Sequence, residues 1–360
     1  MKITLVEKGL KNHGKCFCPN FGKQERELIM EVLYIHHPYK KEEIPKESVV
    51  LALGYFDGVH IGHQAVIKKA KQEAIKRDSK LAVMSFNQHP SIVYKKLDAE
   101  SMKYLSVPER KIALMEQLGV DYFYIIDFTY DFGTLRPQEF VDQYIVGLNA
   151  DAIVAGFDYT YGPKNIADMA HLPSYAKKRF DIIEVSAQVT DNKEKISSTS
   201  IREALDSGNL ERANQMLGYI YQFDGRVMHG DARGRELGFP TANIKIGKYI
   251  RLPKVGVYAV SIRVQGKWYQ GMASIGYNIT FEKDRQKTIE VNIFDFDKMI
   301  YGEKVTVRWH HYLRDEVKFT GIEGLIDQLK QDQIDTEKYF SQHPDQIVDA
   351  DVNSDLEMME

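Results

Sequence analysis

Short runs of apolar residues alternate with amphipathic stretches from Val49 to about Leu205. The runs have the length of buried strands, and the stretches between them repeat their apolar positions at helical spacing. The predicted strands cover residues 49–53, 81–84, 122–126, 152–155 and 182–185, and the predicted helices cover 66–74, 108–118, 137–146, 167–178 and 199–206. Strands joined by helices pair in parallel and are covered on both faces. The pattern therefore predicts a doubly wound α/β domain.

The pattern changes after Leu217 and Gly218. Strands rich in β-branched and aromatic residues then follow one another with short turns and little helix between them. They are predicted at residues 257–264, 268–275, 288–296 and 304–312. This succession favours an antiparallel barrel or sandwich, with one helix at about 322–330 and a second short helix at 336–340.

The two ends of the chain lack such patterning. Met30 stands directly before a well-patterned segment, so residues 1–29 are expected to be a loose leader, or to reflect a start site upstream of the native one. The acidic tail at 341–360 has few large apolar residues and is expected to be disordered. We therefore expect one domain at about 30–210 and another at about 219–340.

Composition narrows the class of protein. The 360 residues are 43% hydrophobic and 28% charged, which suits two globular domains. A formal net charge of −3 gives no general attraction to nucleic acid or anionic membranes. The sequence contains neither an apolar run of bilayer length nor a signal peptide. These features predict a cytoplasmic protein without nucleic-acid or membrane partners, and they leave the oligomeric state open.

The two cysteines, Cys16 and Cys18, both lie in the proposed leader. No disulfide framework can therefore stabilise the rest of the chain. A metal site that combines them with His13 is conceivable. The short spacing and the lack of a second cysteine pair favour the simpler interpretation of a loose leader.

The strongest chemical signal lies between the first predicted strand and the first predicted helix. Residues 54–63 read Gly-Tyr-Phe-Asp-Gly-Val-His-Ile-Gly-His. A helix that starts at the carboxyl end of a parallel strand offers free N–H groups and a partial positive charge to a phosphate. His60 and His63 can donate to phosphate oxygens, and such donors stabilise the charge that develops at an α-phosphate during adenylyl transfer. The alternative is a pair of structural histidines beside an apolar helix.

This segment resembles the His-x-Gly-His nucleotidyltransferase superfamily. From about residue 30 to residue 340 the chain is similar to the prokaryotic bifunctional riboflavin kinase/FAD synthetase family. The resemblance implies that His60 and His63 contact the phosphates of ATP and act in catalysis. It also implies that Gly54, Phe56 and Asp57 belong to the nucleotide pocket.

Two loops extend the resemblance towards the flavin. Residues 86–90, Phe-Asn-Gln-His-Pro, resemble the family's Phe-x-Pro-His-Pro turn near the flavin phosphate, with Gln88 in place of the first proline. Residues 156–162 resemble an aromatic element of the family, although an ordinary aromatic turn has the same pattern. The resemblance implies flavin-binding roles for His89 and Asp158.

A third segment, residues 196–202, places serines and a threonine before an apolar helical pattern. These residues are good N-caps, and hydroxyl and N–H groups at a helix start also bind phosphate. The resemblance implies ATP-binding roles for Ser198, Thr199 and Arg202, with Lys195 where an arginine is common.

The second domain has a glycine-rich signature at residues 230–243, Gly-Asp-Ala-Arg-Gly-Arg-Glu-Leu-Gly-Phe-Pro-Thr-Ala-Asn. Glycines let the backbone approach a nucleotide closely. Thr241 and Asn243 offer neutral oxygens to Mg²⁺, a hard cation that proteins hold with few ligands of their own and with substrate phosphates. The signature matches the riboflavin kinase module, which implies an antiparallel β-barrel and ATP-binding roles for Gly230, Arg235, Gly238, Thr241 and Asn243.

Glu290 is the candidate base of this second site. Strand alternation puts it on the same face as Asn292. A solvated carboxylate is the usual state of a strand glutamate. In the family the matching glutamate takes the proton from the riboflavin 5′-hydroxyl, as a general base does. Two residues depart from the family pattern: Ile279 stands where proline is typical, and Asn292 where histidine is common.

These features favour a bifunctional enzyme. We expect it to phosphorylate riboflavin to FMN with ATP and Mg²⁺, and then to transfer AMP from a second ATP to FMN, giving FAD and pyrophosphate. One alternative keeps the adenylyl transfer and makes the barrel a degenerate flavin holder, which would form no FMN. Another is a flavin- or nucleotide-sensing protein without turnover, which would release no pyrophosphate.

Overall fold

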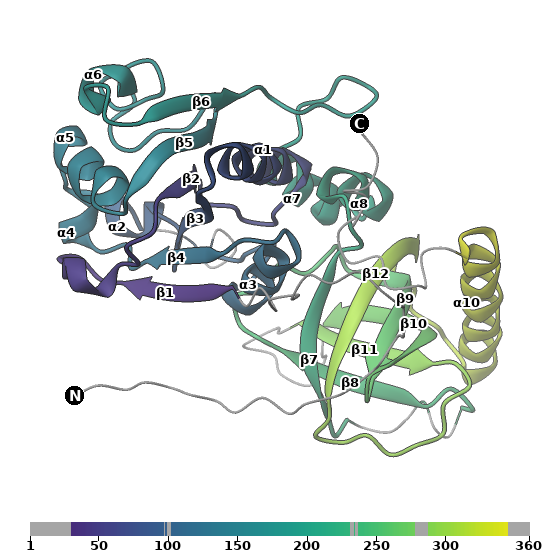
Figure 1. Ribbon diagram of the computed structural model, residues 1–360. Coiled ribbons are helices and arrows are strands. Elements are labelled where there is room, and N and C mark those ends of the chain that lie inside the picture. The colour runs from purple at the N-terminus through teal and green to yellow at the C-terminus, as the bar shows by residue number, and fades with distance from the viewer. Residues whose placement is uncertain are drawn as a thin grey trace, which may run out of the picture.

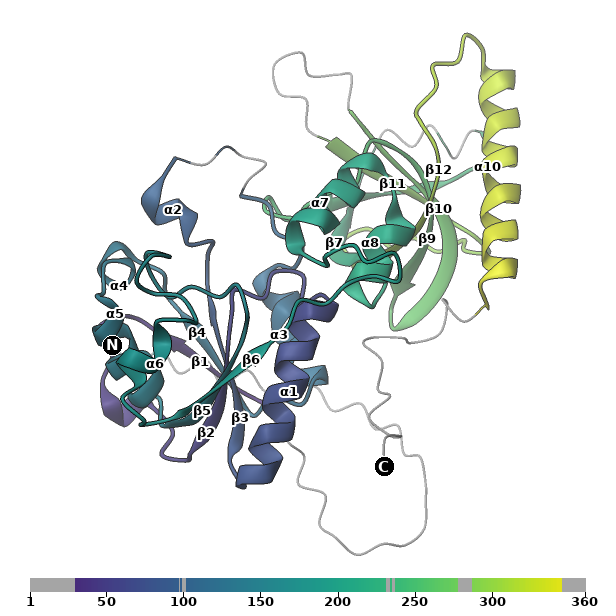
Figure 2. The same cartoon turned by 90° about the horizontal axis from the view of Figure 1, so that it is seen from above.

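The computed structural model describes residues 30–96, 98, 102–230, 234, 237–277 and 287–344. The expected leader at 1–29, Arg235, Ile279 and the acidic tail beyond residue 344 lie outside these ranges. The described part forms an α/β domain and a β-barrel, which lie side by side in Figures 1 and 2. Helix α8 (Leu210–Leu217) lies between them (Figure 1).

A six-stranded parallel sheet forms the first domain, with the strand order β1-β4-β3-β2-β5-β6. The strands are β1 (Glu31–Ile35), β2 (Val49–Leu53), β3 (Lys80–Phe86), β4 (Tyr122–Ile126), β5 (Ala150–Gly156) and β6 (Asp181–Val185). Successive side chains of β2 enter opposite cores, Val50 and Ala52 on one face and Val49, Leu51 and Leu53 on the other. This confirms the predicted doubly wound α/β fold. β1 is an edge strand that the pattern analysis did not assign.

Helices cover both faces of the sheet. Helices α1 (Ile61–Arg77) and α3 (Pro108–Gln117) pack on one face, while α7 (Ser198–Ser207) packs against α8 beside the same core. The other face is covered by α4 (Tyr130–Gly133), α5 (Pro137–Phe140), the π-helical η2 (Val141–Val146) and α6 (Leu172–Ala176). The short η1 (Lys41–Glu43) and α2 (Ser91–Tyr94) lie in loops.

The prediction of a helix over residues 167–178 was wrong in length, because α6 covers only Leu172–Ala176. Pro173 fits only the first turn of a helix, so the helix cannot begin far before it. Lys177 has a left-handed backbone conformation and ends the helix.

Six antiparallel strands close the second domain into a barrel, in the order β10-β11-β8-β7-β12-β9. They are β7 (Gln222–Met228), β8 (Thr241–Ile246), β9 (Gly256–Val264), β10 (Lys267–Tyr277), β11 (Lys287–Ile293) and β12 (Lys304–Arg314). The barrel expected from the family resemblance is confirmed. Strands β7 and β8 were not predicted from the sequence. Asp224 and Gly225 interrupt the apolar pattern of β7, and β8 begins inside the glycine-rich signature.

One helix, α10 (Ile322–Gln342), packs against β9, β10 and β12 (Figure 2). The prediction of two helices, at 322–330 and 336–340, was wrong. Residues 331–335 contain neither glycine nor proline, so the backbone has no reason to break there. Asp332 in this stretch is buried and accepts two hydrogen bonds of 2.7 Å from Arg314 of β12.

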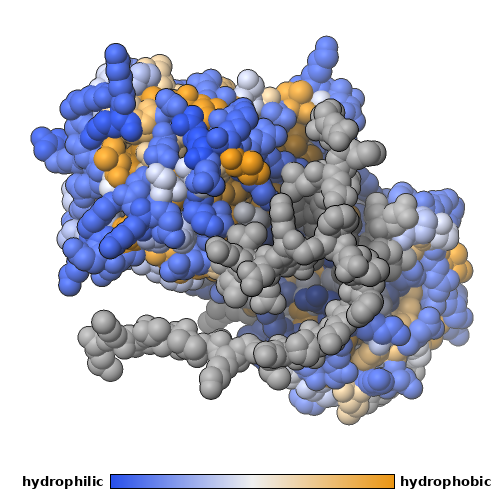
Figure 3. Space-filling view, in the orientation of Figure 1, coloured by the Kyte–Doolittle hydropathy of each residue, from blue (hydrophilic) through white to orange (hydrophobic). Residues whose placement is uncertain are grey.

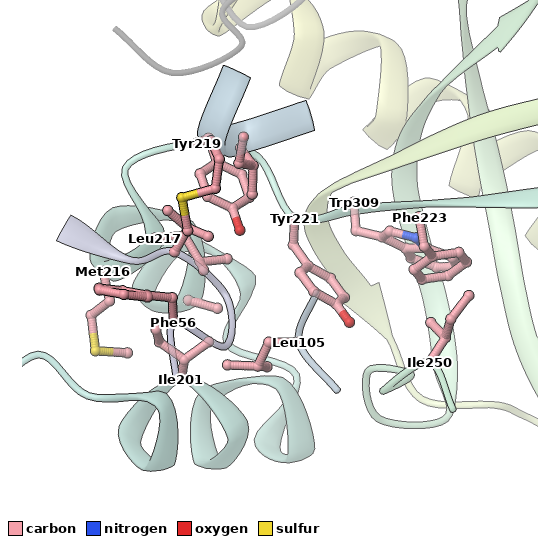
Figure 4. Close-up of a cluster of buried hydrophobic side chains, with 14 of the residues drawn as sticks. Phe56, Leu105, Ile201, Met216, Leu217, Tyr219, Tyr221, Phe223, Ile250 and Trp309 are labelled. Carbon is pink, nitrogen blue, oxygen red and sulfur yellow. The ribbon is translucent and has the colours of Figure 1, made fainter. Parts of the chain in front are cut away.

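The two domains share one apolar core (Figure 4). Phe56, Leu105 and Leu217 belong to it on one side, and Phe223 and Trp309 of the barrel on the other. A tyrosine side chain connects the two parts, because the Tyr219 hydroxyl donates to the Gly58 carbonyl at 2.5 Å. Within the barrel domain, the Tyr221 hydroxyl donates to the Arg251 carbonyl at 2.5 Å.

The surface visible in Figure 3 is mostly hydrophilic, and its hydrophobic side chains form small separate patches. Within the described ranges, no helix has both the length and the apolar character needed to span a membrane.

Candidate active sites

The β2–α1 loop, residues 54–60, leaves the carboxyl end of β2 and leads into the first turn of α1. Its backbone has positive φ angles at Phe56 (54°), Gly58 (82°) and Val59 (38°). Residues other than glycine rarely adopt such angles, and β-branched residues least of all. Strain of this kind persists only where surrounding contacts hold it, and it is frequent at functional sites. Gly54 lies over the Phe56 ring. A Cβ atom added to Gly54 would lie 2.8 Å from Cζ of that ring, so only glycine fits without a shift.

His60 and His63 stack on each other at the start of α1. Their ring centroids lie 3.6 Å apart with an angle of 19° between the planes. His60 is the N-cap, and its Nδ1 accepts a hydrogen bond of 3.3 Å from the backbone N–H of His63. Nδ1 of His63 is buried and has no hydrogen-bond partner among the described residues. A buried nitrogen without a partner, beside the free N–H groups of a helix start, fits a site that a ligand completes.

Burial keeps both histidines neutral. It lowers the pKa of His60 to about 4. The negative charge of Asp158 opposes this shift, whereas the positive charges of Arg202 and Lys195 add to it. The pKa of His63 lies well below its usual value because of burial, and then because of His60 and Lys111. A neutral imidazole still has one N–H to donate, and a bound phosphate would raise both pKa values.

Asp57 holds the β2–α1 loop from the inside. It is only 2% exposed, and its carboxylate accepts hydrogen bonds of 3.0 Å from the backbone N–H groups of Leu105 and Ser106. It also pairs with the guanidinium of Arg202 from α7. The carboxylate of Asp57, which the resemblance assigns to the nucleotide pocket, is thus bound by Leu105, Ser106 and Arg202.

The start of α7 lies against the same loop. Ser197 caps the helix, and the Ser198 hydroxyl donates to the Asp57 carbonyl at 2.9 Å. Thr199 is exposed in the first turn. Lys195 forms a 2.8 Å ion pair with Asp158, which follows the carboxyl end of β5. The fold therefore brings the 156–162 and 196–202 segments to the histidine pair.

His89 lies on another side of the loop, after the carboxyl end of β3. Its ring meets Tyr55 edge to face at a centroid distance of 5.0 Å, and its Nδ1 accepts from the Ser91 N–H at 3.1 Å. Burial lowers its pKa. Gln88, at the position of the missing proline, donates to the Phe128 carbonyl at 2.8 Å and so fixes the turn in another way. A crevice at the carboxyl ends of parallel strands is where open α/β sheets bind ligands.

A second candidate site is a cavity of about 420 Å³ in the barrel domain. This volume lies in the range of small-molecule sites. Its lining residues are Val227, Pro240, Thr241, Ala242, Ile293, Phe296, Asp297, Lys298, Met299, Ile300 and Tyr301. Tyr301 stacks on His229 with a centroid distance of 3.8 Å, which ties the 296–301 segment to the end of β7.

Four oxygen-bearing side chains lie together on two paired strands beside this cavity. Strands β8 and β11 pair so that Glu290 is opposite Asn243 and Asn292 is opposite Thr241. The Thr241 hydroxyl donates to Glu290 Oε2 at 3.3 Å, and the Glu290 side chain is exposed. Asn292, in the place of the family histidine, is buried and donates to the Pro240 carbonyl at 2.8 Å.

Two of the three described glycines of the signature, Gly230 and Gly238, differ in their surroundings. Gly230 lies against Asn243, and a Cβ atom would come within 2.1 Å of the amide nitrogen. Gly238 has a φ of 81° and faces open space. Close packing therefore requires a glycine at position 230. The left-handed backbone conformation favours a glycine at position 238.

Neither the 296–301 segment nor Lys111 was predicted from the sequence to belong to a site. The available signal for the segment was an aromatic strand end followed by a Tyr-Gly turn at 301–302. Lys111 stands in an amphipathic helix and carries no local signal of its own.

Comparison with known proteins covers both domains. Residues 42–200 match the FAD synthetase family, and residues 217–340 match the riboflavin kinase family. A bifunctional riboflavin kinase/FMN adenylyltransferase from Listeria monocytogenes is 49% identical over 316 residues, which is 88% of this chain and 100% of that protein. Its counterpart from Bacillus subtilis is 44% identical over 314 residues, or 87% of this chain and 99% of that protein.

A crystal structure from Streptococcus pneumoniae shows the same arrangement of both domains. It shares 37% identity with this chain, has a TM-score of 0.79, and aligns over 85% of this chain and 98% of its own. That protein is called a macrolide-efflux protein, whereas both relatives above are named for the two flavin activities. On the two family matches and on these identities, the chain belongs to the bifunctional riboflavin kinase/FMN adenylyltransferase family.

Proposed function

We propose that the barrel, about residues 219–340, makes FMN from riboflavin and ATP, and that the α/β domain, about residues 30–210, makes FAD from FMN and a second ATP. One observation carries this assignment: the stacked, neutral His60–His63 pair with an unsatisfied nitrogen lies at a helix start in a chain that also has a riboflavin kinase barrel. A related enzyme that acts on another mononucleotide would have no use for that barrel.

In the α/β domain an oxygen of the FMN phosphate attacks the α-phosphorus of ATP, and the bond to pyrophosphate breaks. We assign His60, His63 and the first N–H groups of α1 to the oxygens of the α-phosphate, where they stabilise the developing charge. Gly54 and Phe56 shape the nucleotide pocket under this assignment. The remaining phosphates are then bound by Lys195, Ser198, Thr199 and Arg202.

On the flavin side, His89 and Asp158 lie after strands β3 and β5, which flank β2 in the sheet. We assign them to the binding of FMN. His89 would present its ring to the phosphate that attacks, while Lys195 remains close to Asp158 through their ion pair.

In the barrel, Glu290 accepts the proton of the riboflavin 5′-hydroxyl, the hydroxyl oxygen attacks the γ-phosphorus, and ADP leaves. A general base must reach the proton that it removes. The exposure of Glu290 beside a cavity of substrate size supports this role. We assign Gly230 and Gly238, together with Thr241 and Asn243, to the binding of ATP in this domain.

Mg²⁺ fits the groups present in the barrel. The Thr241 hydroxyl, the Asn243 side-chain carbonyl and the Glu290 carboxylate are oxygen donors on paired strands, as Mg²⁺ prefers. We propose Thr241 and Asn243 as its protein ligands. Bound there, the ion would supply neutralisation of the phosphate charge.

The test is incubation of the full chain with riboflavin, ATP and magnesium, followed by chromatographic separation of riboflavin, FMN and FAD. Both FMN and FAD are expected from riboflavin. FAD that forms only from added FMN would favour the alternative of a barrel without kinase activity. Binding of flavins without any product would favour a sensing protein.

A further inference from the structure

Lys111 of α3 lies buried behind the β2–α1 loop. Its side chain is almost inaccessible, at 6% exposure of the residue. The ammonium donates to the Tyr55 carbonyl at 2.9 Å and to the Ser85 hydroxyl at 3.3 Å, and it lies 4.6 Å from the centre of the Tyr55 ring. The Ser85 hydroxyl in turn donates to the same Tyr55 carbonyl at 2.7 Å. Strand β3 and helix α3 therefore fix one peptide of the loop together.

The positive charge of Lys111 is not neutralised by direct contact. Within the described ranges, Lys111 takes part in no ion pair. The carboxylate that acts on it electrostatically is Asp57, but the oxygens of Asp57 are bound by Arg202, Leu105 and Ser106. Burial lowers the pKa of Lys111 to about 8, so the ammonium form still predominates at pH 7.

A buried cation is costly when no anion faces it, and an apolar side chain of similar length would avoid this cost. Holding the Tyr55 carbonyl does not by itself require a charge, because an uncharged amide can donate to it as well. The charge becomes favourable when an anion binds on the other side of the loop, since a low-dielectric interior screens it weakly. His63, which faces that side, already responds to the charge of Lys111.

An ammonium has three N–H groups, and two of them are used by Tyr55 and Ser85. Lys111 also lines a cavity of about 70 Å³, together with Tyr104, Ser106 and Asn87. Apolar side chains such as Phe86, Phe123 and Ile125 form much of the rest of its lining. The surroundings of the ammonium are therefore of low polarity apart from the groups named here, and they screen its charge weakly.

We propose that Lys111 is a positioning residue for adenylyl transfer: it holds the β2–α1 loop through the Tyr55 carbonyl and provides a positive charge behind that loop for the bound triphosphate. This role rests on the function proposed above and adds a group to the same site. It acts through the loop and through its charge, not by contact with the reacting atoms.

Three substitutions separate the two parts of the role. Lys111→Met removes both the donor and the charge, Lys111→Gln keeps a donor without the charge, and Lys111→Arg keeps both. The matched control is Lys71→Met, because Lys71 of α1 is half-buried and likewise donates to a backbone carbonyl, that of Leu118, at 3.2 Å. All variants are made in the full chain and assayed at pH 7 for kcat and KM of FAD formation from FMN and ATP.

We expect Lys111→Met and Lys111→Gln to lower kcat by roughly 10–10²-fold, the cost of small misplacements in an active site, with a smaller rise in the KM for ATP. Lys111→Arg and Lys71→Met should stay close to the wild type. Wild-type kcat in Lys111→Met, wild-type kcat in Lys111→Gln, or an equal loss in Lys71→Met would each overturn the proposal. If Lys111→Met fails to fold, the comparison of Lys111→Gln with Lys111→Arg decides. Absence of FAD formation in the wild type would instead refute the proposed function itself.

Discussion

Asp57 and Arg202 form an ion pair that joins the β2–α1 loop to helix α7 across 145 residues of sequence. The carboxylate is buried, while the guanidinium stays partly exposed, with 26% of its side chain accessible. Arg202 can therefore face a bound phosphate while Asp57 keeps it in place. The pair also explains how two separate sequence motifs come to share one site.

Asp57→Asn should destabilise the α/β domain by roughly 3 kcal/mol, because it leaves Arg202 without its carboxylate and weakens two buried hydrogen bonds. Urea unfolding followed by far-UV circular dichroism measures the change in the free energy of unfolding. The control is Asp181→Asn, which removes a surface pair with Arg77 whose aspartate side chain is 69% exposed. That change should cost less than about 1 kcal/mol. Equal free energies of unfolding for the two variants would show that the buried pair contributes no more to stability than the surface pair.

The elements of the candidate sites were predictable where the signal is local. A strand, a glycine-containing loop and two histidines at a helix start follow one another in residues 49–63, so both the fold of this segment and its chemistry could be inferred together. The anchoring of Asp57 by Leu105, Ser106 and Arg202 could not, since these contacts depend on tertiary packing.

The errors have similar causes. Two helices were predicted on either side of residues 331–335, but Asp332 is buried against Arg314 and the helix continues. Lys111 looked like one of many helix lysines. Only the structure shows that its side chain turns inward.

Acidification should destabilise the α/β domain through His60. Its pKa is about 4 in the folded protein and about 6.5 in an unfolded chain. The unfolded state therefore binds more protons between these values, and stability falls as the pH drops from 7 towards 4, by at most about 3 kcal/mol from this residue.

The check is the free energy of unfolding at several pH values for the wild type and His60→Asn, because asparagine can still cap α1. The variant should lose less stability on acidification than the wild type. Parallel curves for the two proteins would mean that His60 does not titrate in this way.

Glu290→Gln should lower FMN formation by about 10²–10⁴-fold, the range for loss of a positioned general base. FAD formation from supplied FMN should continue, since that reaction takes place in the other domain. Glu337→Gln on the outer helix α10 is the control, because this glutamate is exposed and bonds only within its helix in the structure.

Both tryptophans, Trp268 and Trp309, lie in the barrel. Their fluorescence can therefore report whether Glu290→Gln leaves the barrel folded. If the folded variant formed FMN at the wild-type rate, Glu290 would not be the base and would be an ordinary solvated carboxylate on a strand.

The central claim is one active site per domain, with the histidine pair serving only the adenylyl transfer. The most direct measurement gives riboflavin, ATP and magnesium to the wild type and to His60→Ala, both shown to be folded by circular dichroism, and follows FMN and FAD over time. We predict that His60→Ala forms FMN at the wild-type rate and that FMN accumulates, because its conversion to FAD slows by roughly 10²–10³-fold. Loss of FMN formation in the folded variant, or FAD formation at the wild-type rate, would contradict the account.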